Sequence, residues 1–140
     1  MDNESTDRIP FEPICNVPII RGRMGEVCID LMVKGKRVRL ALGTGAKISY
    51  IDEAFTNGET IIETRDDFNP LIGKFSTPIH ALEASVGNQP FSVNFGKLPP
   101  VMAMSLKMMG IYGAIGFDLF NTFMVLMDFR NNVLSLRFKN

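Results

Sequence analysis

Apolar and polar residues alternate along two neighbouring segments near the start of the chain. Apolar side chains occupy every second position in residues 27–33, and residues 38–42 repeat the pattern after the turn Lys34-Gly35-Lys36. A period of two residues is typical of a strand with one face in the core. The two segments therefore predict a β-hairpin.

Short apolar runs, separated by glycine, proline and asparagine, continue through the rest of the chain. They predict strands at residues 48–51, 60–64, 79–86, 91–95, 111–116, 123–127 and 133–138. Turn residues at 87–90 and 130–132 predict two more hairpins, whereas residues 66–78 are expected to be turn-rich. One helical turn is expected at 52–55, a helix at 101–109 with its methionines as core filler, and a short helix at 117–121. The pattern predicts a mostly β fold with few, short helices.

Size and composition favour one folded domain. The chain has 140 residues, of which 46% are hydrophobic and 21% are charged. A chain of this length can bury its own core. Residues 1–13 are polar with two prolines and predict a flexible tail, which leaves residues 14–140 as a single domain. The formal net charge is 0, so no overall attraction to nucleic acid or to an anionic membrane is expected. Without an export signal or a long apolar run, the expected location is cytoplasmic.

Rare residue types exclude several kinds of site. The single histidine, His80, excludes zinc sites built from several imidazoles, and we expect a structural or surface role for it. Cys15 and Cys28 cannot form a four-thiolate site, and we expect two small buried residues, although one bridge would be available in an oxidising compartment. The Gly43-Thr44-Gly45 run lacks the third glycine of a dinucleotide-binding loop, because Ile48 stands there. No metal and no cofactor are therefore expected.

Two segments carry a more specific signal. Residues 40–49 read LALGTGAKIS, and residues 113–120 read GAIGFDLF. Together and in this order, over residues 18–138, they resemble the retropepsin-like aspartic peptidases, a family of single-domain homodimers. The resemblance implies one half of a pepsin-like barrel and an extended peptide or protein as substrate. It assigns Thr44 and Gly45 to the catalytic loop, and it gives supporting roles to Ala46, Ala114, Ile115, Gly116 and Asp118.

The chain departs from that family at the residue that performs catalysis. Gly43 occupies the position of the catalytic aspartate. Aspartic peptidases need two carboxylates that share a proton, one from each chain of the dimer. Glycine can neither activate water nor donate a proton, and Asp52, Asp118 and Asp128 lie elsewhere in the sequence. We therefore expect a dimer that is inactive as written.

Three interpretations remain open at this stage. Gly43 is an inactivating substitution in an endopeptidase, or the chain is a naturally non-catalytic peptide-binding or assembly module, or it is an unrelated small β-barrel. Residues 66–95 are the candidate for a mobile flap, with Gly73 and Gly87 in its turns. The 9 methionines and 11 phenylalanines suggest an apolar cleft, although core packing would explain the same composition.

Overall fold

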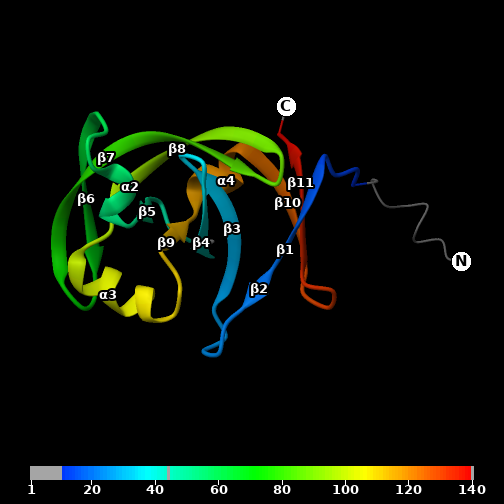
Figure 1. The fold of residues 1–140 in the computed structure, drawn as a ribbon, viewed down its shortest axis with the longest axis horizontal. Helices are drawn as coiled ribbons and strands as arrows, with labels where there is room; N and C mark the ends of the chain where they lie inside the picture. Colours follow the sequence, from blue (N-terminus) through cyan, green and yellow to red (C-terminus); the bar gives the residue numbers. More distant parts are fainter. Residues whose placement is uncertain (1–10, 44, 140) are drawn as a thin grey trace, which may run out of the picture.

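The structure, a computed structural model, describes residues 11–43 and 45–139 and is built mainly of β-strands (Figure 1). Residues 1–10 of the predicted tail lie outside the described residues, so the tail stays a prediction. The strands are β1 (Cys15–Pro18), β2 (Ile20–Arg21), β3 (Val27–Val33), β4 (Lys36–Leu42), β5 (Ser49–Ile51), β6 (Ile61–Asn69), β7 (Gly73–Val86), β8 (Gln89–Lys97), β9 (Gly113–Ile115), β10 (Phe123–Asp128) and β11 (Val133–Phe138). The helices are α2 (Glu53–Thr56), α3 (Pro100–Met108) and α4 (Phe117–Thr122).

The strands form two sheets. The larger sheet has the order β2-β3-β4-β9-β5-β8-β7-β6, and β3 also pairs with β7. This extra pairing closes a barrel of β3, β4, β9, β5, β8 and β7. β6 lies outside the barrel, at an edge of the sheet. The smaller sheet has the order β1-β11-β10 and lies at one end of the molecule, beside both ends of the described chain (Figure 1).

The first hairpin confirms the alternation in the sequence. β3 and β4 pair antiparallel, with Ile29 opposite Leu40 and Leu31 opposite Val38. All four of these side chains are at most 1% exposed. They join a core that extends to Leu119 and Leu136, so this hairpin is one wall of the barrel.

The expectation of a turn-rich stretch at residues 66–78 is wrong. β6 continues to Asn69 and β7 begins at Gly73, so only residues 70–72 lie between the two strands. Paired positions such as Asp66 and Ser76 are both exposed and polar. Polar side chains are tolerated here because main-chain pairing maintains the hairpin and, within the described part of the chain, one side of β6 has no neighbouring strand.

The prediction that the α3 methionines fill the core is also wrong. Met104 is 70% exposed and Met108 is 89% exposed, and only Ala103 of this helix is buried. The buried residues that anchor the segment, Leu98 and Ile111, lie just outside the helix. Because these flanking residues hold α3 against the body, the helix itself presents most of its apolar surface to solvent. Among the described residues, no helix has the length and apolarity needed to cross a membrane.

The remaining rare residues have structural surroundings. His80 is 5% exposed, and its Nδ1 lies 3.2 Å from the carbonyl oxygen of Glu59, which agrees with a structural role. Both cysteines are free. Cys28 is buried as expected, whereas Cys15 is only half-buried.

Candidate active site

The loop that follows β4 is tied to the end of β9. β4 and β9 run parallel, with Leu42 beside Ile115. The Gly43 amide donates to the carbonyl oxygen of Ile115 at 2.9 Å, and the Ala46 amide donates to the carbonyl oxygen of Gly43 at 3.0 Å. These bonds make a tight turn at the position where the resemblance places the catalytic residue. Thr44, between the two loop glycines, lies outside the described residues.

Gly116 locks this loop against the start of α4. Its amide donates to Ser49 Oγ at 3.1 Å, and the next amide, of Phe117, donates to the carbonyl oxygen of Ala46 at 3.0 Å. A Cβ atom on Gly116 would lie 2.5 Å from the Ala46 oxygen and 2.7 Å from the Gly43 oxygen. Only glycine allows so close an approach of two backbone segments. The two sequence segments singled out above therefore meet at Gly116.

Ser49 belongs to this site but was not among the predicted residues. It is 0% exposed, and its hydroxyl accepts the bond from Gly116. The sequence signal for its role was a small polar residue within an apolar strand. Such a hydroxyl, once buried, needs a hydrogen-bond partner.

Asp118 has a structural contact at one side of the site. Its Oδ2 accepts a hydrogen bond of 2.6 Å from the Asn94 amide in β8. Burial raises the pKa of this carboxyl above its ordinary value, although hydrogen bonds to the carboxylate oppose part of the shift. The carboxylate thus joins α4 to β8.

The other acidic residues considered as replacements are occupied elsewhere. Asp52 is 4% exposed, accepts from the Ala54 amide at the start of α2, and pairs with Lys107 at 2.9 Å. Asp128 accepts hydrogen bonds in the turn after β10, including one of 2.8 Å from the side chain of Asn131. Both carboxylates therefore perform local structural tasks.

Position 43 itself has room for a side chain. A Cβ atom on Gly43 would lie 3.1 Å from Ala46 Cβ and 3.9 Å from the Ile115 oxygen, and the backbone is outside the left-handed region. The contact with Ala46 is tight, and because this methyl is fixed to the backbone, its relief needs Ala46 itself to shift by a few tenths of an ångström. The loop geometry therefore does not require glycine at position 43, in contrast to position 116.

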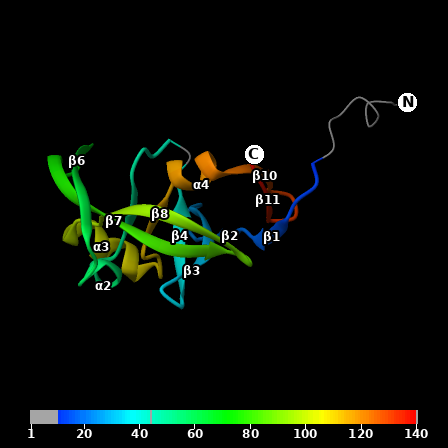
Figure 2. The same ribbon diagram turned by 90° about the horizontal axis from the view of Figure 1, so that it is seen from above.

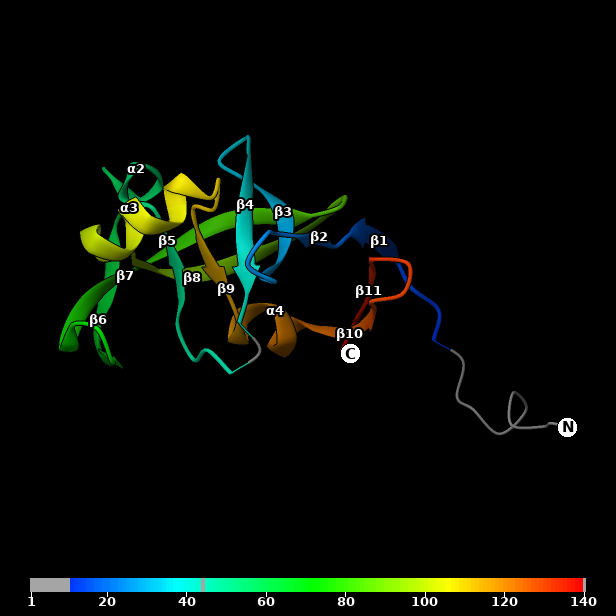
Figure 3. The ribbon, with the colours of Figure 1, turned by 90° about the horizontal axis from the view of Figure 1, so that it is seen from below.

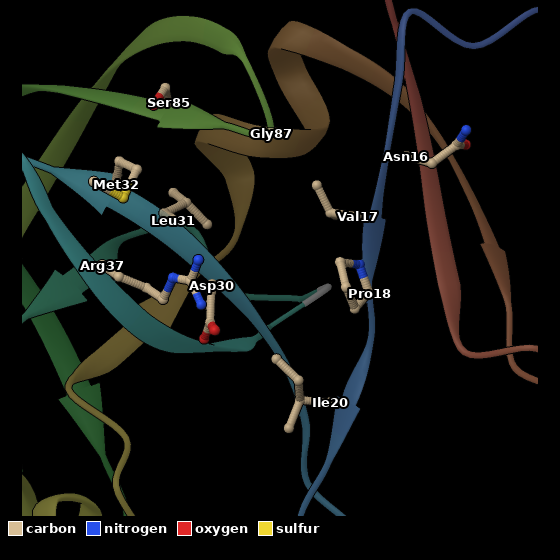
Figure 4. Close-up of a pocket in the computed structure, with 10 residues that line it drawn as sticks. All are labelled: Asn16, Val17, Pro18, Ile20, Asp30, Leu31, Met32, Arg37, Ser85 and Gly87. Carbon is tan, nitrogen blue, oxygen red and sulfur yellow. The ribbon is translucent and has the colours of Figure 1, made fainter.

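The two glycines proposed for a flap lie at opposite ends of β7. Gly73, with φ of +80°, begins β7 at the tip of the β6–β7 hairpin, whereas Gly87 lies in the turn between β7 and β8. A Cβ atom on Gly87 would lie 3.1 Å from Cys15 Sγ, and the residue borders a cavity of about 290 Å³ beside β1 and β3 (Figure 4). In this cavity Asp30 is already paired with Arg39 at 2.9 Å. The structure therefore does not bring the two glycines together.

The β6–β7 hairpin and the loop after β4 extend towards the same side of the molecule as α4 (Figures 2 and 3). A cavity of about 610 Å³ lies between this hairpin and the loop residue Lys47. Its lining consists of Lys47, Asp66, Asp67, Phe68, Lys74, Phe75 and Ser76. Five of these seven residues are polar or charged, and two are phenylalanines. The largest buried phenylalanines, Phe95 and Phe123, are in the core instead.

One hydrogen bond connects the hairpin to the barrel near this cavity. The hydroxyl of Tyr50, in β5, donates to Oδ2 of Asp67, in β6. Burial and the neighbouring carboxylate raise the pKa of Tyr50 well above its ordinary value, so the phenol remains a donor at neutral pH. The Tyr50 and Phe75 rings lie with their centroids 6.2 Å apart.

The likeness of this chain to known proteins lies in its fold. No protein-family model matches the chain, and no curated protein matches it in sequence. Among solved structures, a retropepsin-like aspartic protease from Rickettsia conorii superposes with a TM-score of 0.57 at 16% identity, covering 92% of this chain and 96% of that one. The fold is that of the retropepsin-like aspartic proteases. At this identity the likeness concerns the fold alone.

A second solved structure, the Simian Foamy Virus (mac) protease, has a TM-score of 0.41 and 20% identity. It covers 57% of this chain and 94% of that one. The retropepsin-like fold agrees with the sequence prediction of a mostly β acid-protease half with short helices.

Proposed function

We propose that the chain is a retropepsin-like aspartic endopeptidase scaffold that is silent as written, because Gly43 stands at the position of the catalytic aspartate. The observation that carries the proposal is the bonded arrangement of Gly43, Ile115 and Gly116. These hydrogen bonds and close contacts support the interpretation that the loop holds the residue at position 43 in one orientation. The retained room for a Cβ atom at that position supports the same interpretation.

The proposed chemistry needs two copies of the chain. In an aspartic peptidase, one carboxylate acts as general base towards a water molecule while the other donates a proton to the scissile carbonyl. In the proposed homodimer, each chain would contribute position 43 across a two-fold axis. With glycine in both copies, neither proton transfer has a donor or acceptor. The dimer keeps a peptide cleft without its acid–base pair.

The proposed substrate is a peptide or protein segment in extended conformation. Among the described residues, β6 pairs with β7 on one side only, so its other edge offers main-chain groups to an added strand. This edge belongs to the hairpin that faces the loop after β4, which supports a flap role for residues around Gly73. Gly87 lies at the far end of β7 and is not part of the proposed flap.

The test restores the carboxylate. The chain, its Gly43→Asp variant and its Gly45→Asp variant are incubated with a diverse peptide mixture from pH 4 to 7, with and without a statine-type inhibitor. We expect inhibitor-sensitive cleavage by the Gly43→Asp variant alone. Gly45→Asp is the matched control, because a Cβ atom there meets nothing within 4 Å and the new carboxylate lies in the same loop.

Sedimentation of the same three proteins at micromolar concentration reports the association state, and we expect dimers. Cleavage by none of them, with Gly43→Asp folded and dimeric, would contradict the endopeptidase proposal and indicate a binding or assembly role. A strictly monomeric chain would contradict the two-fold cleft.

A further inference from the structure

The side chain of Tyr50 spans two strands of the larger sheet. Tyr50 is in β5 and its hydroxyl donates to Asp67 in β6, although β8 and β7 lie between these strands in the sheet order. Its ring lies against Gly96, its register partner in β8. A Cβ atom on Gly96 would lie 2.9 Å from Cε1 of Tyr50 and 3.1 Å from its Cδ1. Glycine at position 96 therefore leaves the space that the ring occupies.

The Tyr50 ring also contacts the hairpin formed by β6 and β7. Its centroid lies 6.2 Å from that of Phe75 in β7. Asp67 and Phe75 are register partners, so the tyrosine reaches both strands of the hairpin at the same level. The hydroxyl and the ring of Tyr50 therefore hold the same part of the hairpin.

The hairpin tip, residues 66–76, has few other contacts with the barrel. None of its side chains is buried, and none belongs to the hydrophobic core. Among the described residues, the other hydrogen bonds of its side chains are local, such as that from Ser76 to Asp66. Apart from the two strands that continue into the tip, the contacts of Tyr50 are therefore its main attachment in the described part of the chain.

The same tip borders the cavity of about 610 Å³ beside Lys47. Asp67 and Phe75, which Tyr50 contacts, are both part of the lining. The hairpin and the loop after β4, which contains position 43, extend to this side of the molecule (Figures 2 and 3). The width of the cavity therefore depends on where Tyr50 holds the tip.

We propose that Tyr50 is a positioning residue for the proposed flap. Its hydroxyl and ring hold the hairpin tip at one distance from the loop after β4, and they thereby set the opening through which an extended peptide reaches that loop. The inference rests on the proposed function and adds to it the residue that fixes the flap. Without the bond to Asp67, the tip would occupy a wider range of positions, and affinity falls with the fraction of molecules in the binding-competent position.

Distances between two spin labels test this role in the full chain. Leu71→Cys carries one label at the tip, where the native side chain is 85% exposed, and Lys36→Cys carries the other at the exposed start of β4. Both native cysteines are replaced by alanine, so that only the introduced thiols react. We expect a narrow distribution of distances in this chain and a broad one after Tyr50→Phe. Asp67→Asn keeps an acceptor oxygen for the hydroxyl and should retain the narrow distribution.

Two further variants separate this role from a general loosening of the fold. Gly96→Ala places a methyl group where the Tyr50 ring lies, so it should broaden the distribution although the hydroxyl is retained. Tyr112→Phe is the matched control, because Tyr112 is 38% exposed and lies outside the cavity, and it should leave the distribution narrow. A narrow distribution in Tyr50→Phe would overturn the inference. Equal broadening in Tyr50→Phe and Tyr112→Phe would also overturn it.

Kinetics in the Gly43→Asp chain relate the position of the tip to the substrate. Adding Tyr50→Phe should raise KM roughly threefold to tenfold and leave kcat within about twofold, because the change affects access and not the acid–base pair. An unchanged KM would overturn the role of Tyr50 in peptide access. Absence of cleavage by Gly43→Asp itself would overturn the proposed function, whereas the label distances separately decide whether Tyr50 positions the tip.

Discussion

The carbonyl oxygen of Gly43 lies 2.7 Å from the point that a Cβ atom on Gly116 would occupy. The Ala46 oxygen lies 2.5 Å from the same point. Two segments separated by about 70 residues in sequence thus meet backbone to backbone, without a side chain between them. The contact sets the shape of the loop in which position 43 lies, whatever residue occupies that position.

This contact predicts that Gly116→Ala is strongly destabilising. The added methyl group would overlap two backbone oxygens that cannot rotate away, and overpacking of this kind costs about 1–3 kcal/mol. Urea unfolding of the variant measures the loss. Gly45→Ala is the control, since a Cβ atom at position 45 has open space around it, and its free energy of unfolding should stay within about 0.5 kcal/mol of the parent chain. Equal stability of the two variants would contradict the packing argument.

The raised pKa of Asp118 predicts a specific dependence of stability on pH. Burial raises this pKa above the ordinary 3.8, so the folded chain keeps the proton to a higher pH than the unfolded chain does. The contribution of Asp118 to the free energy of unfolding is therefore complete below about pH 4 and is lost as the pH rises through the folded pKa. Asp118→Asn should remove this trend, which urea unfolding from pH 3 to 7 measures.

Asp128→Asn provides the comparison of opposite sign. Hydrogen bonds from Asn131 lower the pKa of Asp128, so its contribution is present above about pH 4 and is lost as the pH falls through the folded pKa. The two differences from the parent chain should therefore slope in opposite directions with pH. Parallel slopes would show that the surroundings of Asp118 have been misread.

The bond between Tyr50 and Asp67 predicts a local effect on the hairpin. Tyr50→Phe removes the donor and leaves the half-buried Asp67 carboxylate with the Phe68 amide alone. A hydrogen bond to a charged group contributes roughly 1.5–3 kcal/mol, so we expect a loss near the lower end of that range. Compared with the parent chain, the variant should show faster hydrogen exchange in residues 61–75 and unchanged exchange in β3.

Tyr112→Phe is the control for that variant. Tyr112 is 38% exposed, and its hydroxyl makes no hydrogen bond within the described part of the chain. Its substitution should leave both stability and hydrogen exchange of the hairpin unchanged. The same loss in both variants would mean that the Tyr50 bond contributes nothing particular.

Local pattern explains how much of the fold was predictable. The period of two in residues 27–42, the turn residues after Val86 and the glycine after α3 act on their immediate neighbours, and the structure has the expected elements there. The short motif Ala114-Ile115-Gly116 was also informative, because two backbone segments can approach this closely only where one of them has a glycine. Residues 66–78 misled because their strand character comes from pairing within an exposed hairpin and not from an apolar pattern.

The exposure of the α3 methionines and the cavity beside Lys47 could not be predicted from the sequence. Composition counts apolar side chains but does not say which of them face the core, and Met108 is almost fully exposed. Likewise, nothing in the sequence places Lys47 and Lys74 at the same cavity, because this depends on where the β6–β7 hairpin lies relative to the loop after β4.

By itself, the sequence predicted a mostly β fold with three hairpins and few, short helices. It also contained, in order, two segments that resemble those of retropepsin-like aspartic peptidases, and it showed that position 43 has no carboxylate. These properties follow from residue type and near-neighbour spacing. Only the tertiary structure decided that the two segments meet at Gly116, that Ser49 and Asp118 hold them by hydrogen bonds, and that no backbone atom blocks a Cβ atom at position 43. Such relations depend on distances between segments far apart in the chain, which are set by barrel closure and not by any local preference.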